Sequence, residues 1–179
     1  MSKMLKSLPG LIALVMLLPL FTQAQAGSGA EDTSAYFPML RGKKIGVVAN
    51  NASEVSGVNI VDFLAGKGFG IKRIFSPEHG FRSAAEAGQH TGDMTDPVTG
   101  IPVVSLYNQK RKPAPSDLDD LDLVVFDIQD VGARFYTFIS TMLLSMEAAA
   151  ELHIPFIVLD RPNPINGVAM EGAILEYPR

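Results

Sequence analysis

The sequence contains no cysteine, which excludes disulfide bonds and thiolate–zinc sites. It also has no excess of basic residues, because 19 Asp and Glu outnumber 15 Lys and Arg and the formal net charge is −4. This balance argues against a nucleic-acid partner, which normally requires a basic face. The motifs G-x-G-x-x-G, the Walker loop and G-x-S-x-G are absent as well. The usual dinucleotide, nucleoside triphosphate and α/β-hydrolase sites are therefore not expected.

The first 26 residues have the three-part pattern of a secretory signal peptide. Lys3 and Lys6 precede an apolar stretch at 11–21, and small residues at 24–26 supply a cleavage site. The stretch is too short for a membrane span of about 20 residues. Position 27 is glycine and not the cysteine of a lipoprotein. We therefore expect an exported protein, periplasmic or extracellular, with no membrane association after cleavage.

Short apolar runs alternate with helix-like segments in the rest of the chain, which is long enough for one domain. The runs lie at 43–49, 71–75, 101–106, 123–126 and 155–159. Helical spacing predicts helices at 58–67 and 137–152, the second with Phe138, Met142, Leu143 and Met146 on its core face. This alternation predicts an α/β fold with an open parallel sheet of about five strands and helices on both faces. Ligands bind such sheets beyond the carboxyl ends of the strands.

Each of these runs ends in residues able to do chemistry. Glu78 and His79 follow the second run, on a long glycine-rich segment at 76–100. They could act as general acid or base, or Glu78 could satisfy backbone donors in a turn. A metal site formed by His79 with His90 and Asp93 is a further alternative, but their spacing matches no strong metal template.

The fourth run is followed by Asp127 and Asp130, close to Arg134. The two carboxylates could orient a sugar hydroxyl, hold a cation, or pair with Arg134, which could itself clamp a carboxylate. A structural salt bridge with a helix cap would explain the same residues.

Five segments together resemble one family in order and spacing. They are 76–82 (Ser-Pro-Glu-His-Gly-Phe-Arg), 96–103, 105–107, 126–137 (Phe-Asp-Ile-Gln-Asp-Val-Gly-Ala-Arg-Phe-Tyr-Thr) and 159–164 (Leu-Asp-Arg-Pro-Asn-Pro). The chain from about 40 to 171 resembles the NamZ-type exo-β-N-acetylmuramidases, glycoside hydrolases once catalogued as a domain of unknown function. The resemblance implies a Rossmann-like N-terminal domain, a smaller C-terminal domain and an active site between them. It also implies removal of N-acetylmuramic acid from non-reducing ends of peptidoglycan fragments, in cell-wall recycling.

The resemblance implies site residues too, and neither a cofactor nor a metal. Glu78 is the leading catalytic carboxylate, with His79 beside it. The expected substrate-binding residues are Asn50, Arg82, Tyr107, Asp127, Gln129, Asp130, Arg134, Tyr136, Asp160, Arg161 and Asn163. The expected partners are peptidoglycan-derived muramic acid saccharides, whose lactyl carboxylate would suit Arg134 or Arg82.

The chain departs from the family pattern in several places. Residues 49–53 keep Asn50 but lack an expected proline, and Ser83-Ala84 replaces a glycine and a small polar residue. We expect a flexible leader at 27–39, the Rossmann-like catalytic domain at 40–166, and at 167–179 the start of a C-terminal domain missing from this chain. A fragment, a truncated gene product of reduced activity and a non-catalytic sugar-binding remnant stay open.

Overall fold

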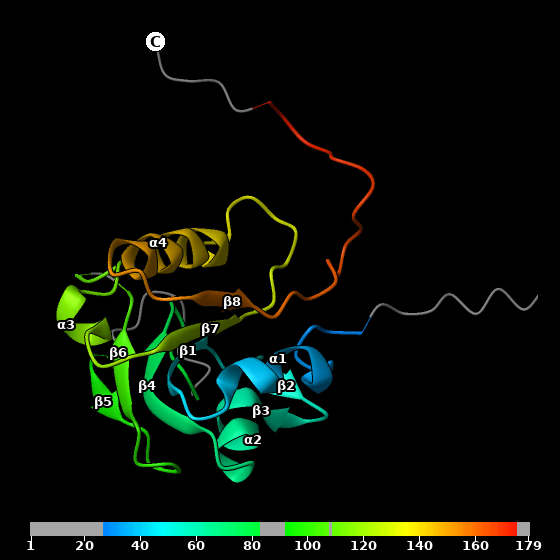
Figure 1. Ribbon diagram of the computed structural model, residues 1–179. Coiled ribbons are helices and arrows are strands. Elements are labelled where there is room, and N and C mark those ends of the chain that lie inside the picture. The colour runs from blue at the N-terminus through cyan, green and yellow to red at the C-terminus, as the bar shows by residue number, and fades with distance from the viewer. Residues whose placement is uncertain (1–26, 83–91, 108, 175–179) are drawn as a thin grey trace, which may run out of the picture.

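A central sheet organises the chain. The computed structural model describes residues 27–82, 92–107 and 109–174. The strands of the sheet are β1 (Lys44–Ala49), β4 (Gly70–Ser76), β5 (Met94–Thr95), β6 (Pro102–Ser105), β7 (Leu123–Asp127) and β8 (Phe156–Val158). They lie in the order β5-β6-β4-β1-β7-β8 (Figure 1). All neighbours pair in parallel except β5, which runs antiparallel to β6.

The strand order is that of a Rossmann-like sheet. Counted along the chain, the five parallel strands lie in the order third, second, first, fourth and fifth. The order reverses between β1 and β7, and ligands of such sheets bind at this reversal. The predicted fold class is therefore confirmed; β5, two residues long, makes the sheet six-stranded where about five strands were expected.

The two central strands are buried on both faces, as their continuous apolar runs predict. Every residue of β7 is buried, and so is every residue of β1 after Lys44. Packing around β1 leaves no room for a side chain at Gly46. A Cβ there would lie 2.7 Å from Leu121 Cδ1 and 2.9 Å from Phe75 Cε2.

Two helices cover one face of the sheet. They are α1 (Thr33–Leu40) and α2 (Ile60–Gly66), and the hairpin of β2 (Glu54–Val55) and β3 (Val58–Asn59) leads into α2. Their buried residues form one cluster with the sheet, including Leu40, Ile60 and Leu64. The Asn59 side chain caps α2 by accepting a hydrogen bond from Val61 N at 3.0 Å, which satisfies an amide that the helix leaves unpaired.

Residues 27–39 differ from the expected flexible leader, because most of them form α1 and pack on the domain. Tyr36 is 2% exposed, and its hydroxyl donates to the Ala30 carbonyl at 2.8 Å. Gly29 N also donates to the Asp160 carbonyl at 2.6 Å. Burial raises the pKa of Tyr36 to about 12, and the negative charge of Asp127 adds to this shift.

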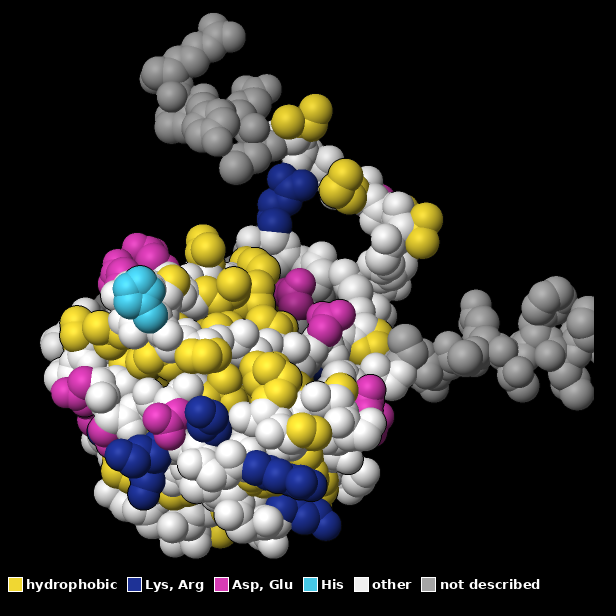
Figure 2. Space-filling view, viewed as in Figure 1, with side chains coloured by type: hydrophobic (Ala, Val, Ile, Leu, Met, Phe, Trp, Pro, Cys, Tyr) yellow, Lys and Arg dark blue, Asp and Glu magenta, His cyan; other side chains and the backbone are white. Residues whose placement is uncertain are grey.

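The opposite face carries α3 (Pro115–Leu118) and α4 (Phe138–Glu151), whose buried residues form a second cluster. The predicted core face of α4 is partly wrong. Phe138 is buried and Met142 half-buried, but Leu143 is 64% and Met146 39% exposed. Small residues face the sheet instead, at Thr141, Ser145, Ala148 and Ala149, and they let the helix approach closely. Figure 2 shows the resulting hydrophobic side chains exposed over this helix.

None of the helices in the described ranges is long and apolar enough to cross a membrane. The predicted signal peptide at 1–26 lies outside the described residues.

Candidate functional site

The predicted site residues follow the carboxyl ends of the parallel strands and so lie along one edge of the sheet. The structure divides most of them into three groups. One group is buried at the carboxyl ends of β1 and β7, a second surrounds Glu78, and a third lines a cavity beyond β7.

A buried ion pair lies at the carboxyl ends of the paired strands β1 and β7. The Asp127 side chain, at the end of β7, is fully buried. Arg161 donates to both of its carboxylate oxygens, through Nε at 2.6 Å and Nη2 at 2.9 Å. The same Nη2 donates to the Glu54 carbonyl at 2.9 Å. Burial raises the pKa of Asp127, and Arg161 opposes that shift. The pair joins the centre of the sheet to the segment after β8.

Asn50 lies in a tight turn beside this pair and is 4% exposed. Its Oδ1 accepts from Ala52 N at 3.0 Å and from the Ser53 hydroxyl at 3.2 Å. The Ser53 hydroxyl is also hydrogen-bonded to the Asp127 carbonyl. Asn59 Nδ2 donates to the Asn50 carbonyl at 3.0 Å. The structure therefore places Asn50, Asp127 and Arg161, all predicted to bind sugar, in internal contacts at the strand-order reversal.

Glu78 lies in a different environment, on the turn that follows β4. His79 has φ 74° and Gly80 φ 78°. A left-handed conformation is uncommon for a residue other than glycine, and such positions cluster at functional sites. Glu78 and His79 are both half-buried. The turn presents the Glu78 carboxylate at the edge of the sheet, within reach of two other elements.

Two hydroxyl groups contact the Glu78 carboxylate. Tyr107, after β6, hydrogen-bonds to it, and this bond is the largest cause of a raised pKa at Tyr107. The Thr137 hydroxyl, at the start of α4, donates to Glu78 Oε2 at 3.2 Å. Segments following β4 and β6 and preceding α4 thus converge on one carboxylate. Thr137 is not among the residues predicted from the sequence; a threonine before a helix is also a common capping residue.

The third group lines an open cavity of about 730 Å³ between the segment after β7 and residues 163–171. Asp130, Arg134 and Asn163 are among its lining residues. Gln129 Nε2 joins the two walls at their base, donating to the Asp130 carbonyl at 2.6 Å and the Pro162 carbonyl at 3.0 Å. Arg134 Nη1 donates to the Ala173 carbonyl at 2.8 Å, so it reaches across the cavity.

A glycine is needed at the wall of this cavity. Gly132 has φ +72°, and a Cβ there would lie 2.5 Å from Asn163 Oδ1. Two aromatic side chains are exposed between the cavity and Thr137, namely Phe135 (80%) and Tyr136 (40%). Their ring centroids are 5.4 Å apart. The segment 134–137 therefore connects the cavity to the Glu78 carboxylate and presents an apolar surface on the way.

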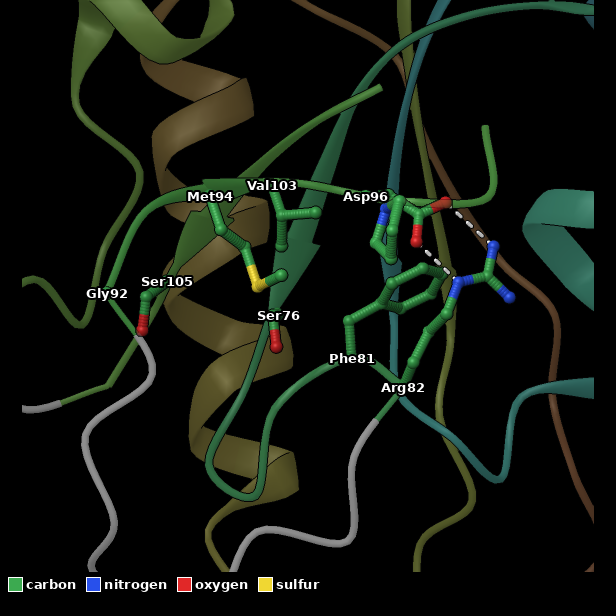
Figure 3. A pocket seen from close by; sticks show the side chains of 9 residues that line it. Ser76, Phe81, Arg82, Gly92, Met94, Asp96, Val103 and Ser105 are labelled. Carbon is green, nitrogen blue, oxygen red and sulfur yellow. Dashed lines mark hydrogen bonds and ion pairs between the residues drawn. The ribbon is translucent and has the colours of Figure 1, made fainter. Parts of the chain in front are cut away.

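Arg82 is held apart from these groups by two carboxylates. It forms bidentate contacts with Asp62 at 2.7 and 2.8 Å and with Asp96 at 2.5 and 2.8 Å. The Arg82 guanidinium and the Thr99 donors bring the pKa of the buried Asp96 down to about 2, against the effect of burial. Figure 3 shows Arg82 and Asp96 beside a small pocket of about 120 Å³. Apart from Arg82, no predicted site residue is among its described lining residues.

Asp160 has an exposed side chain. Together with Asp130 and Arg161 it lines a smaller cavity of about 150 Å³ between α4 and the ends of β7 and β8.

The alternative of a metal site finds no support in the described ranges. No group of three His, Cys, Asp or Glu side chains there could hold a metal ion. Of the predicted set, His90 lies outside the described residues. Asp93 accepts from Ser105 N at 2.9 Å, and its other oxygen lies 3.9 Å from Lys110 Nζ.

The family described as "Exo-beta-N-acetylmuramidase NamZ, N-terminal" matches residues 45–178. The chain belongs to this family. The resemblance expected from the five segments is thereby confirmed. NamZ from Bacillus subtilis (strain 168), named as a peptidoglycan β-N-acetylmuramidase, is 48% identical over 145 residues. That match covers 79% of this chain and 34% of the relative.

Two crystal structures of DUF1343 family proteins from Bacteroides fragilis NCTC 9343 resemble this NamZ-family chain. Both are 41% identical to it, with TM-scores of 0.72 and 0.65. The first covers 83% of this chain and 38% of the solved chain, and the second 76% and 35%. The chain thus spans about a third of the length of these relatives. None of these comparisons tests an individual site residue, so the roles expected for them stay predictions.

Proposed function

We propose that this chain carries the catalytic carboxylate of an exo-acting glycosidase that removes N-acetylmuramic acid from non-reducing ends of peptidoglycan fragments. The observation that carries the proposal is the placement of Glu78 at the carboxyl edge of the sheet. It is held by Tyr107 and Thr137 and linked by segment 134–137 to an open cavity of about 730 Å³. The likeness to the Bacillus subtilis muramidase supports the same substrate class.

Arg134 is a better candidate than Arg82 for binding the lactyl carboxylate of muramic acid. Arg82 already contacts two carboxylates, Asp62 and Asp96. Arg134 is exposed, lines the cavity and donates to a backbone carbonyl through Nη1. A planar guanidinium in such a place can clamp a ligand carboxylate through two parallel hydrogen bonds. The exposed rings of Phe135 and Tyr136 next to it offer a face on which the sugar ring can lie.

Glycoside hydrolysis usually needs two carboxyl groups, one of them acting as general acid. Asp127 does not suit the second position, because its side chain is fully buried and bound to Arg161. Asp130 is exposed and lines the cavity. We assign the role of catalytic carboxylate to Glu78 and propose Asp130 as a sugar-binding residue on the same edge.

The test is release of free sugar from a chromogenic β-N-acetylmuramic acid glycoside by the 179-residue chain. Glu78→Gln should abolish release, since the amide can neither take nor give the proton. Glu147→Gln is the matched control, because Glu147 is an exposed residue of α4 that pairs with Lys112.

The same assay separates catalysis from binding alone. Saturable binding of the glycoside without release would show a sugar-binding domain, which is the second function expected from the sequence. Absence of both release and binding would refute the proposal for this chain.

We also propose that the protein is exported, to the periplasm or the cell exterior. The proposal rests on the pattern of residues 1–26. Fractionation of expressing cells, with N-terminal sequencing of the product, tests it.

A further inference from the structure

Thr137 occupies the capping position of α4 without capping it. An N-cap threonine normally accepts a hydrogen bond from an amide in the first turn, with its own backbone extended. Among the described residues, the Thr137 side chain makes no capping bond, and its φ and ψ are −93° and −4°. This backbone conformation lies outside the extended region typical of caps. The hydroxyl donates to Glu78 Oε2 at 3.2 Å instead.

The backbone of Thr137 still begins the helix. Its carbonyl accepts from Thr141 N at 3.1 Å, which closes the first turn. The Thr141 hydroxyl also donates to this carbonyl at 3.4 Å. A side-chain cap normally stabilises the helix that it begins. Giving up that contribution for a contact with Glu78 indicates that the contact serves the carboxylate and not the helix.

From this geometry we propose that Thr137 is a positioning residue, which holds the Glu78 carboxylate in its working orientation together with the Tyr107 hydroxyl. This inference rests on the proposed function, because only a catalytic Glu78 has a working orientation. Tyr107 approaches from the segment after β6, and Thr137 from the start of α4. Two donors from different elements restrict how the carboxylate can rotate. General acid–base catalysis depends on such alignment of the group with the substrate.

The variants Thr137→Val and Thr137→Ser test this proposal, because valine keeps the shape of threonine and removes the hydroxyl. Ser140→Ala, an exposed position in the first turn of α4, is the matched control. In Thr137→Val, kcat should fall about 10- to 100-fold with little change in KM, as expected for a misplaced catalytic group. Thr137→Ser should restore most of the activity, and Ser140→Ala should not alter it.

A second measurement needs no turnover. The hydrogen bond to Glu78 raises the pKa of Tyr107, and ¹³C NMR of the tyrosine rings can follow that titration, with Tyr107→Phe for assignment. Glu78→Gln gives the pKa of Tyr107 without the carboxylate. Thr137→Val should move the pKa of Tyr107 from the wild-type value towards this limit, and Thr137→Ser should leave it in place.

Unchanged titration of Tyr107 in Thr137→Val, with a clear shift in Glu78→Gln, would overturn the proposal. No shift in Glu78→Gln would overturn it too, since Tyr107 would then not contact Glu78. Loss of thermal stability in Thr137→Val with normal kcat would show an ordinary helix cap. If wild type shows no turnover but the titration behaves as expected, the proposed function fails while the positioning of Glu78 stands.

Discussion

Replacing Arg161 by methionine should destabilise the domain strongly. Arg161 is 10% exposed and its partner Asp127 is not exposed at all, so the ion pair is buried. Removing one partner of a buried pair costs about 3–5 kcal/mol, because the other charge stays buried without compensation. Domains of this size are stable by about 5–15 kcal/mol. The midpoint of thermal unfolding should therefore fall by about 6–20 °C.

The loss should also depend on pH. Burial raises the pKa of Asp127, and the variant removes the Arg161 contacts that oppose this shift. A carboxyl whose pKa is higher in the folded than in the unfolded protein lowers the free energy of unfolding only above the unfolded pKa of about 4. Below that pH it is protonated in both states and has no effect; above it, the loss of stability grows with pH. Urea unfolding of Arg161→Met should thus show a large loss at pH 7 and a smaller one at pH 4. Far-UV circular dichroism is the suitable probe, because the chain has no tryptophan.

Two further variants make this prediction falsifiable. Arg73→Met removes one side of a more exposed pair, whose side chains are 20% and 47% exposed, and should cost no more than about 1 kcal/mol. The double variant Asp127→Asn with Arg161→Met should be more stable at pH 7 than Arg161→Met alone, since the uncompensated charge is gone. A loss below about 1 kcal/mol in Arg161→Met, or an equal loss at both pH values, would refute the reasoning and leave both residues available for a ligand.

Two other outcomes are expected. Arg134→Ala should weaken the preference for muramic acid over glucosamine glycosides, measured as the ratio of their kcat/KM values, and an unchanged ratio would exclude contact with the lactyl group. Asp96 has a pKa of about 2, lowered by Arg82, so its stabilisation is complete above about pH 4 and is lost as the pH falls towards 2. Asp96→Asn should accordingly cost about 2 kcal/mol at pH 7 and little near pH 2 in urea unfolding, and a constant cost would contradict that assignment.

The sheet could be predicted from the sequence because its central strands are buried on both faces and are apolar throughout. The segment at 27–39 could not, because it opens with Gly-Ser-Gly and carries Pro38 inside its helix. Hydrophobicity also misplaced the core face of α4. Leu143 and Met146 point outward there, while Ser145 and Ala149 face the sheet, because close packing favours small side chains.

The sequence predicts that the polar site residues lie together at the strand ends. It does not predict which of them form ion pairs with one another and which stay exposed. Asp127 and Arg161 are 34 positions apart, and only the fold shows that they neutralise each other. Arg82 is bound by Asp62 and Asp96, which lie 20 and 14 positions away. A sequence shows which residues can form ion pairs, but the strand order decides which of them meet. Glu78 follows the end of β4 as the sequence predicts, and its catalytic role stays a prediction.

The buried contacts at the carboxyl ends of β1 and β7 affect how this domain can change. The buried ion pair of Asp127 and Arg161 lies at the carboxyl ends of the central strands. The exposed Thr137 and half-buried Glu78 and Tyr107 lie on other segments. Substitutions in these segments should therefore leave the folded core intact. A variant changed at Glu78, Tyr107 or Thr137 should accordingly still be a well-folded protein.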